Sequence, residues 1–216
     1  MYGIIAVLLI MMRRVIPFFI EKGIGQNVTV KNRQWIDVSS AIIFVFFTVA
    51  EVFSEFTTLS GLLAGILFIL HSTRLYGWYN KAIFSKPLLW ILYLGYSFIT
   101  FGFGLFAVSD IFGLPSSLAI HALSVGGIGL ISLGMMARVT LGHTGRNVFN
   151  PPNMLKIVFT LIVLAAVFRV VFPIINSAHY PLWILLSQVL WIFSFLIFSW
   201  RFVPMLIKSR IDNLYG

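Results

Sequence analysis

The sequence contains no cysteine among its 216 residues. Disulfide bonds, thiolate metal sites and thiol nucleophiles are therefore excluded. The chain also lacks three motifs that are typical of soluble enzymes: a phosphate-binding P-loop, the G-x-S-x-G turn of serine hydrolases and the H-E-x-x-H metal-binding helix. The sequence leaves open whether the protein is an enzyme, and any catalytic residues stay unknown.

Charge is the second scarce property. Only 10% of the residues are charged, whereas 60% are hydrophobic and the mean hydropathy is +1.01. A soluble domain carries about a quarter charged residues, so this chain has too few polar side chains to cover a surface in water. It is predicted to be all-α, a polytopic transmembrane helix bundle. The net charge of +9 does not point to nucleic acid, because basic loops at a membrane surface explain it.

Six segments reach the length of roughly 20 apolar residues that a membrane span needs, and they form one predicted membrane domain over residues 1–216. These segments are 35–55, 59–79, 88–108, 117–137, 154–175 and 181–203. A further apolar run, Tyr2 to Met12, is predicted to be too short to cross and to be the end of a span whose beginning is missing. A cleaved signal peptide is the alternative, although Arg13 and Arg14 follow the run where small residues would mark a cleavage site.

The basic residues fall on alternate connections between the predicted spans. Fourteen of the fifteen Lys and Arg residues lie on one side of the predicted membrane, and Arg169 is the exception. Because cytoplasmic loops are enriched in Lys and Arg, the pattern predicts a cytoplasmic C-terminus. Arg169 lies within the fifth segment and is predicted to pair with an acidic residue of the outer side, Glu51, Glu55 or Asp110.

The four histidines divide by depth into two predicted pairs. His71 and His143 lie toward the cytoplasmic side, and His121 and His179 lie toward the outer side. His121 and His143 flank one predicted span, about 33 Å apart at 1.5 Å per residue, so they cannot bind one metal ion. Imidazole is a common ligand of metals and haem. The alternative is a hydrogen bond to a neighbouring carbonyl or hydroxyl group or, for His179, plain solvation in its loop.

Small residues and arginines surround these histidines. Ala122, Gly126 and Gly129 recur at helical spacing, which favours close packing of another helix; room for a flat macrocycle is the functional alternative. Arg138 and Arg146 crowd a short cytoplasmic loop that could hold carboxylates, phosphates or haem propionates. A positive-inside loop explains the arginines equally, although it gives no reason for the sequence LGHTG beside them.

The stretch 121–146 resembles the hallmark of the NnrS family of bacterial membrane proteins, a span that opens HAL-x-VG and ends MMARV-x-LGHTGR. Three further stretches match the same family pattern in the same order: RRVIPFFI at 13–20, RLYGW at 74–78, and WRFVPML with RIDNLYG at the C-terminus. The resemblance implies a multi-span protein of the bacterial inner membrane that contains haem and copper. It also implies a role in denitrification and in tolerance of nitric oxide and nitrosative stress.

The resemblance further suggests site residues and partners. The histidines of the hallmark correspond to His121 and His143, the candidate metal and cofactor ligands, and its terminal arginine corresponds to Arg146. Arg138, and His71 just before RLYGW, are additional candidates for cofactor binding.

The resemblance covers the second half of a typical member, so the chain is expected to be either a fragment or a natural short form. Besides the lipid bilayer, the expected partners are the missing N-terminal half, a second copy of the chain or an electron-transfer partner. The alternative function is a non-catalytic membrane subunit, or a transporter-like half without a cofactor of its own.

Overall fold

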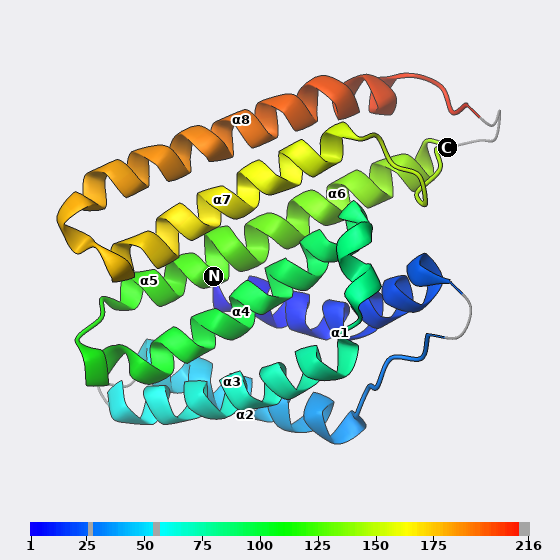
Figure 1. The fold of residues 1–216 in the computed structure, drawn as a ribbon. Helices are drawn as coiled ribbons and strands as arrows, with labels where there is room; N and C mark the ends of the chain where they lie inside the picture. Colours follow the sequence, from blue (N-terminus) through cyan, green and yellow to red (C-terminus); the bar gives the residue numbers. More distant parts are fainter. Residues whose placement is uncertain (26–27, 54–56, 212–216) are drawn as a thin grey trace.

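The computed structural model describes residues 1–25, 28–53 and 57–211, and all regular structure in these ranges is helical (Figure 1). The elements are α1 (Tyr2–Ile24), α2 (Gln34–Phe53), α3 (Thr57–Trp78), η1 (Lys81–Ser85), α4 (Pro87–Phe112), α5 (Ser116–His121), η2 (Ala122–Gly129), α6 (Leu130–His143), α7 (Met154–Ile175), η3 (Ser177–His179) and α8 (Tyr180–Ile207). The predicted all-α transmembrane bundle is confirmed.

Seven helical segments of the described chain are long and apolar enough to cross a membrane. Six correspond to the predicted spans, and α5, η2 and α6 together form one of them, Ser116–His143. The seventh is α1, Tyr2–Ile24. The apolar run Tyr2 to Met12 was predicted to be too short to cross the membrane, but the helix that contains it is longer than the run. The helix continues past Met12 through Arg13 to Ile24, because arginine is a good helix former and Arg13 finds a carboxylate on α2.

The contacts of α1 fix its register along the bundle. Tyr2 packs edge-to-face on Phe47 of α2, with ring centroids 5.7 Å apart. Arg13 pairs with Asp37, near the start of α2, at 3.0 Å. The apolar run therefore lies beside only the part of α2 between Asp37 and Phe47. The remainder of α1 continues beside the connection that precedes α2, where Glu21 accepts a hydrogen bond from a backbone N–H at 3.0 Å.

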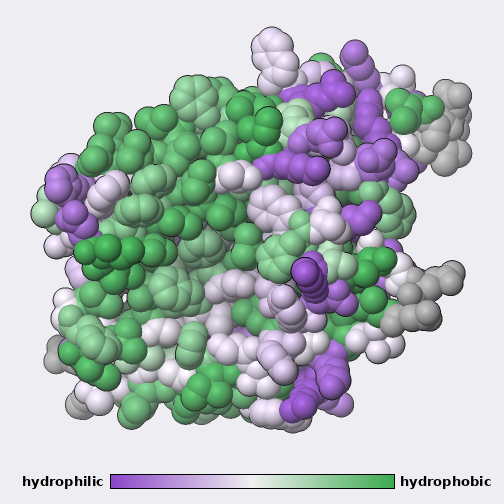
Figure 2. Space-filling model, in the orientation of Figure 1, coloured by the Kyte–Doolittle hydropathy of each residue, from purple (hydrophilic) through white to green (hydrophobic). Residues whose placement is uncertain are grey.

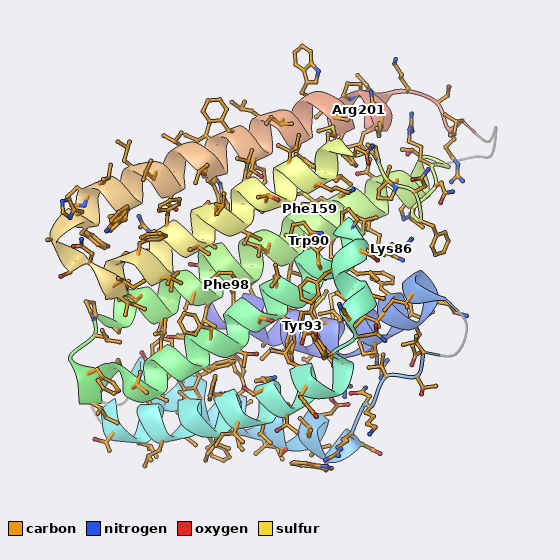
Figure 3. The ribbon with its side chains drawn as sticks, in the orientation of Figure 1. Lys86, Trp90, Tyr93, Phe98, Phe159 and Arg201 are labelled. Carbon is orange, nitrogen blue, oxygen red and sulfur yellow. The ribbon has the colours of Figure 1, made fainter. Side chains whose placement is uncertain are left out.

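Helix α4 lies in the middle of the bundle. It packs against α3 on one side and against the α5–η2–α6 span on the other, and α2 and α8 lie at the two edges seen in Figure 1. Helix α4 accordingly buries thirteen of its 26 residues, whereas α8 buries five of its 28. Trp90 of α4 meets Phe159 of α7 edge-to-face at 5.7 Å (Figure 3). A central helix and lipid-facing edge helices are what a membrane bundle of this composition requires.

Polar and apolar surfaces separate along the helix axes. Figure 2 shows a broad hydrophobic band, a dense hydrophilic region where α8 ends, and few hydrophilic residues at the other end. Lys86 at the start of α4 and Arg201 near the end of α8 both lie on the hydrophilic side (Figure 3). We call this the basic end and the other the opposite end. The predicted cytoplasmic connections, before α2, between α3 and α4 and between α6 and α7, all lie at the basic end.

The span that follows His121 departs from α-helical geometry. Its segment η2 is a π-helix, a form that is rare and frequent at functional sites. A Cβ atom on Gly126 would lie 2.4 Å from the side chain of Phe98 on α4, and one on Gly129 would lie 2.5 Å from Trp191 on α8. These two glycines therefore allow aromatic side chains of neighbouring helices to pack against the span, as the packing interpretation predicts.

Candidate functional site

A buried arginine of α3 is the centre of a polar network at the basic end. The Arg74 side chain is only 3% exposed. Its Nη2 donates to Asp37 Oδ1 on α2 at 2.7 Å, and its Nη1 donates to the Tyr96 hydroxyl on α4 at 2.7 Å. The other oxygen of Asp37 accepts from Arg13 Nη1 at 3.0 Å. One carboxylate thus neutralises two guanidinium groups only in part, and the three charged side chains keep a net charge of +1.

His71 completes the network on the side of α4. Its Nδ1 lies 2.7 Å from the Tyr96 hydroxyl oxygen, and its ring stacks on Phe103 with centroids 5.5 Å apart. Because Arg74 donates to that oxygen, the Tyr96 O–H is available to donate to Nδ1, and the bonding pattern assigns the imidazole proton to Nε2. His71 is fully buried, and its Nε2 has no hydrogen-bond partner among the described residues.

Sequence reasoning named His71 but missed its partners. The sequence predicts Arg13 and Arg74 only as basic residues of cytoplasmic connections, and it assigns no role to Tyr96. Asp37 carried a usable signal, because the chain has only six acidic residues and this one lies in the first turn of an apolar helix. A carboxylate at that position requires a cationic partner. Nothing in the sequence shows that two arginines from different helices supply it.

A second histidine–arginine contact lies toward the opposite end. Arg169 Nη2 of α7 lies 3.0 Å from His121 Nε2, at the junction of α5 and η2. Of the three acidic partners predicted for Arg169, Glu51 and Asp110 form no ion pair with it, and Glu55 lies outside the described residues. An arginine donates to the lone pair of an imidazole nitrogen, so the proton of His121 resides on Nδ1. That atom is buried and has no hydrogen-bond partner within the described ranges.

Two adjoining cavities lie next to Arg169. The first, of about 320 Å³, is lined by Arg169, Ser187 and Gln188 together with Val125, Trp191 and Ile192. The second, of about 460 Å³, shares Val125 and Trp191 with the first and extends along η2, α6 and α8 past Gly129 and Phe195. A cationic group therefore faces a cavity whose other walls are mostly apolar, on the lipid-facing side of the π-helical segment.

The LGHTGR stretch has a structural role at the end of α6. The N–H of Arg146 donates to the carbonyl of Leu141 at 2.8 Å, and the N–H of Gly145 donates to that of Gly142 at 3.3 Å. Gly145 has a φ of +73°. These two bonds and the positive φ define the Schellman motif, in which a glycine ends a helix. The helix cap therefore explains part of a sequence for which a positive-inside loop gave no reason.

The residues predicted on the cytoplasmic side do not come together. His143 is exposed at the end of α6, and it forms no hydrogen bond or ion pair with any described residue. Arg146 reaches a carbonyl of its own loop at 3.4 Å, and the Arg138 guanidinium lies 3.5 Å above the ring of Phe19 on α1. His71 contacts none of these three. The common depth of His71 and His143 therefore does not translate into a shared site.

The predicted outer pair separates as well. His179 is exposed in the turn between α7 and α8, where its Nδ1 lies 3.4 Å from Asn176 Oδ1. His121 contacts Arg169 instead. His121 and His143 lie toward the two ends of the helical span Ser116–His143, so they cannot share a site. In the described part of the chain, the four histidines therefore lie in four different environments.

These arrangements test which cofactors the chain could hold. Among the described residues, no three side chains of the types His, Cys, Asp and Glu gather as a metal site requires. A copper site built from three such side chains is therefore not formed in that part of the chain. Haem requires less, namely one or two axial side chains and basic groups for its propionates. His71 with Arg74, and His121 with Arg169, each supply one imidazole beside one guanidinium, so the residues fit a haem.

Comparison with known proteins extends over almost the whole chain. The family described as NnrS protein matches residues 1–210. No curated protein and no solved structure matches the chain. The family match begins in α1 and includes every helix through α8. With this coverage, and with the hallmark stretch forming the span that carries His121, the chain belongs to the NnrS family.

Proposed function

We propose that this protein is a haem-binding membrane protein of the bacterial nitric oxide response, serving denitrification and tolerance of nitrosative stress. The observation that carries the proposal is the contact between His121 and Arg169 beside two connected cavities. Family membership supports it, because haem and nitric oxide are associated with NnrS proteins in general.

His121 presents the chemistry of an axial ligand. The lone pair on its Nε2 is the one that now accepts from Arg169, and such a lone pair is what imidazole offers to haem iron. With Nε2 bound to iron, the Arg169 guanidinium would be free for a propionate, to which arginine binds through paired N–H donors. The apolar walls contributed by Val125, Trp191 and Phe195 would exclude water from the macrocycle. A bound haem supplies an iron centre that takes small diatomic molecules and exchanges electrons.

The other predicted residues have distinct proposed uses. His71 could ligate iron only after its proton moves from Nε2 to Nδ1, where Tyr96 would hold it, as the partners of metal-bound histidines do. His143, exposed at the end of α6, and Arg138 and Arg146 nearby could serve a second haem or a copper ion. Copper at His143 needs further ligands from outside the described residues or from another chain.

We place the protein in the bacterial inner membrane with its basic end and C-terminus in the cytoplasm. The positive-inside distribution of Lys and Arg supports this orientation, and the hydrophobic band of Figure 2 supports burial in lipid. His121 and Arg169 then lie toward the outer side. An electron-transfer partner, a second copy of the chain or an N-terminal half would bind in this frame.

A difference spectrum tests the proposal. The chain is expressed in a bacterial host, purified in detergent, and analysed by reduced-minus-oxidised spectroscopy and by metal content. We expect a haem Soret band in the wild type, loss of most of the band in His121→Ala, and no change in His179→Ala. His179 is the matched control because it is an exposed histidine at the same end.

Two outcomes contradict the proposal. A wild-type protein without a Soret band, both alone and in isolated membranes, removes the haem function. Equal haem content in His121→Ala and the wild type shows that another residue ligates the iron. The absence of haem and metal in every variant favours the alternative of a non-catalytic or transporter-like subunit.

A further inference from the structure

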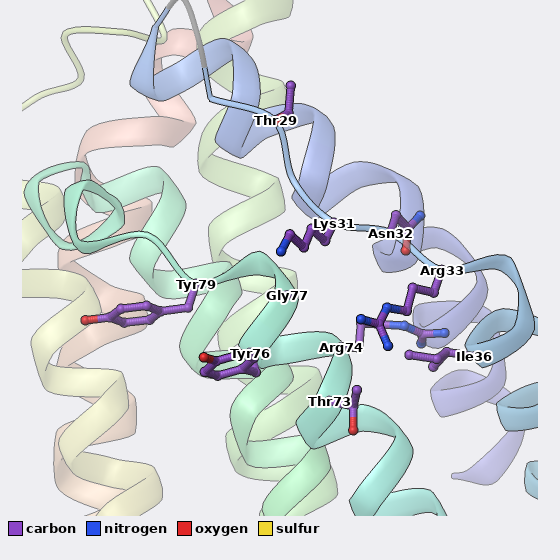
Figure 4. Close-up of a pocket in the computed structure, with 10 residues that line it drawn as sticks. All are labelled: Thr29, Lys31, Asn32, Arg33, Ile36, Thr73, Arg74, Tyr76, Gly77 and Tyr79. Carbon is purple, nitrogen blue, oxygen red and sulfur yellow. The ribbon is translucent and has the colours of Figure 1, made fainter.

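A basic pocket lies beside Arg74, at the connection that precedes α2. It measures about 380 Å³ and is formed by the connection before α2 together with the ends of α2 and α3 (Figure 4). Its ten lining residues include three cations, Lys31, Arg33 and Arg74, and no acidic residue. Asn32 and Thr29 add side chains with hydrogen-bond donors, whereas the Thr73 hydroxyl already donates to the Ile69 carbonyl at 2.8 Å. A pocket with this lining offers several N–H and O–H donors and a positive charge that is only partly compensated.

The positive charge of this pocket is only partly neutralised by the protein. Both oxygens of Asp37 are occupied by Arg13 and Arg74. Lys31 and Arg33 form no ion pair with any residue that the structure describes. Arg74 is buried, and its Nε has no hydrogen-bond partner there. Lys31 and Arg33 are exposed, and Arg74 shares its one carboxylate with Arg13, so an anion in the pocket would balance the charge that Asp37 leaves over.

The backbone around the pocket is tightly built. The N–H of Lys31 donates to the Gly77 carbonyl at 3.3 Å, which ties the connection before α2 to the end of α3. A Cβ atom on Gly77 would lie 2.8 Å from the carbonyl oxygen of Lys31, so only glycine allows this approach. The position of the cations is therefore set by packing, which distinguishes this pocket from a mobile basic loop.

A second cavity beside Arg74 indicates the kind of anion. This cavity, of about 460 Å³, lies between α1 and α2, and aliphatic side chains such as Leu9, Ile10 and Val38 form most of its wall. Arg74 lines both cavities. Phosphate groups of lipids lie at the depth of the membrane interface, and acyl chains continue into the apolar layer. A basic pocket beside an apolar cavity is complementary to such a molecule.

We propose that the pocket formed by residues 29–33 and the end of α3 binds the phosphate group of an anionic phospholipid. Lys31, Arg33 and Arg74 hold the phosphate, and the acyl chain lies along the cavity between α1 and α2. The phosphate site does not depend on haem. It involves none of the residues that are proposed to bind haem at the opposite end. It gives the positive charge of the basic end, which underlies the net charge of +9 of the chain, one specific use beyond general attraction to the membrane.

Lipid titration of the purified protein by native mass spectrometry tests this site. The probes are phosphatidylglycerol, phosphatidylcholine and inorganic phosphate. The variant Lys31→Gln with Arg33→Gln removes two exposed cations of the pocket, and Lys156→Gln with Arg201→Gln removes two exposed cations elsewhere at the basic end. Since one basic residue near a membrane surface contributes about 1 kcal/mol, we expect about fivefold weaker phosphatidylglycerol binding per charge removed and roughly 25-fold weaker binding for the pocket variant.

The control variant separates a site from a charged surface. Undiminished phosphatidylglycerol affinity in Lys156→Gln with Arg201→Gln, together with the loss in the pocket variant, supports the proposal. Equal losses in the two variants, or no preference of the wild type for phosphatidylglycerol over phosphatidylcholine, overturn it. Binding of inorganic phosphate that depends on Lys31 and Arg33, without any lipid preference, supports a phosphate pocket and overturns its assignment to lipid.

Discussion

The two arginines that contact a histidine, Arg74 and Arg169, are balanced in different ways. Arg74 is buried at the basic end and bonds to a carboxylate, to a tyrosine hydroxyl and to Ser40 Oγ at 3.3 Å. Arg169 is half-buried, has His121 as its side-chain partner among the described residues and faces a cavity. Removing the carboxylate partner of a buried charge is strongly destabilising, whereas a charge whose described partner is a neutral imidazole keeps its full affinity for an anion. The difference assigns a stabilising role to the Asp37 network of the basic end and the proposed haem binding to the opposite end.

The largest expected effect on stability comes from removing the Asp37 carboxylate at the basic end. Asp37→Asn leaves Arg13 and Arg74 without their shared negative partner, and breaking a buried pair from one side costs about 3–5 kcal/mol. We expect a marked fall in the unfolding temperature measured in detergent. Asp110→Asn is the control, because Asp110 is exposed at the opposite end. Equal unfolding temperatures for the two variants would show that the network does not stabilise the bundle.

The next effect concerns packing around the π-helical segment. Gly126→Ala places a Cβ atom 2.4 Å from the Phe98 ring and 2.6 Å from its Cβ, so the helices must separate. Overpacking of this kind costs about 1–3 kcal/mol. Gly142→Ala is the matched control, because a Cβ there meets nothing within 4 Å. The unfolding temperature should fall only in Gly126→Ala, and a stable variant would mean that η2 tolerates a wider helix spacing.

A smaller loss is expected from the hydroxyl that joins Arg74 to His71. Tyr96→Phe removes the acceptor of one Arg74 N–H and the partner of His71 Nδ1. Leaving such groups unsatisfied in the interior costs about 2 kcal/mol. Tyr93→Phe removes a half-buried hydroxyl that bonds to a backbone carbonyl at 3.1 Å, and it should cost less. If Tyr93→Phe lowers the unfolding temperature more than Tyr96→Phe does, the polar network around Arg74 contributes little to stability.

Substitution of Arg169 is expected to have the smallest effect on stability and the clearest effect on function. Arg169→Gln removes one hydrogen bond to His121, which contributes about 1 kcal/mol or less to stability. Haem retention during purification should nevertheless fall, because the guanidinium that we propose to bind a haem propionate is lost. Arg201→Gln, an exposed change at the basic end, should leave both quantities unchanged. A large drop in unfolding temperature with intact haem content would reverse the assignment of roles to the two ends.

Sequence patterns predicted the architecture well because lipid makes simple demands. The spans could be predicted from length and hydropathy alone. The alternation of Lys and Arg then predicted which connections lie on the same side of the membrane. The predicted end of the apolar run at Met12 was wrong as a helix boundary, since charge alone does not end a helix when a partner lies within reach. Arg13 shows this directly, because Asp37 of another helix accepts its hydrogen bond.

The site was predicted less well, and the histidines show why. Depth can be read from the position of a residue in its span, so His71 and His143 were correctly assigned to one side. Depth does not give the direction in which a side chain points around the helix axis. His71 points into the bundle and His143 is exposed, and the LGHTGR stretch owes its second glycine to a helix cap. Direction depends on which helices are neighbours.

The sequence by itself determined the membrane environment, the all-helical fold, the basic end and the family resemblance, because each follows from local composition or from a contiguous motif. The tertiary structure decided the partners: Asp37 between Arg13 and Arg74, Tyr96 beside His71, and Arg169 against His121. These contacts join residues on different helices. They arise from the packing of seven helices against one another, a long-range property that hydropathy and charge do not encode.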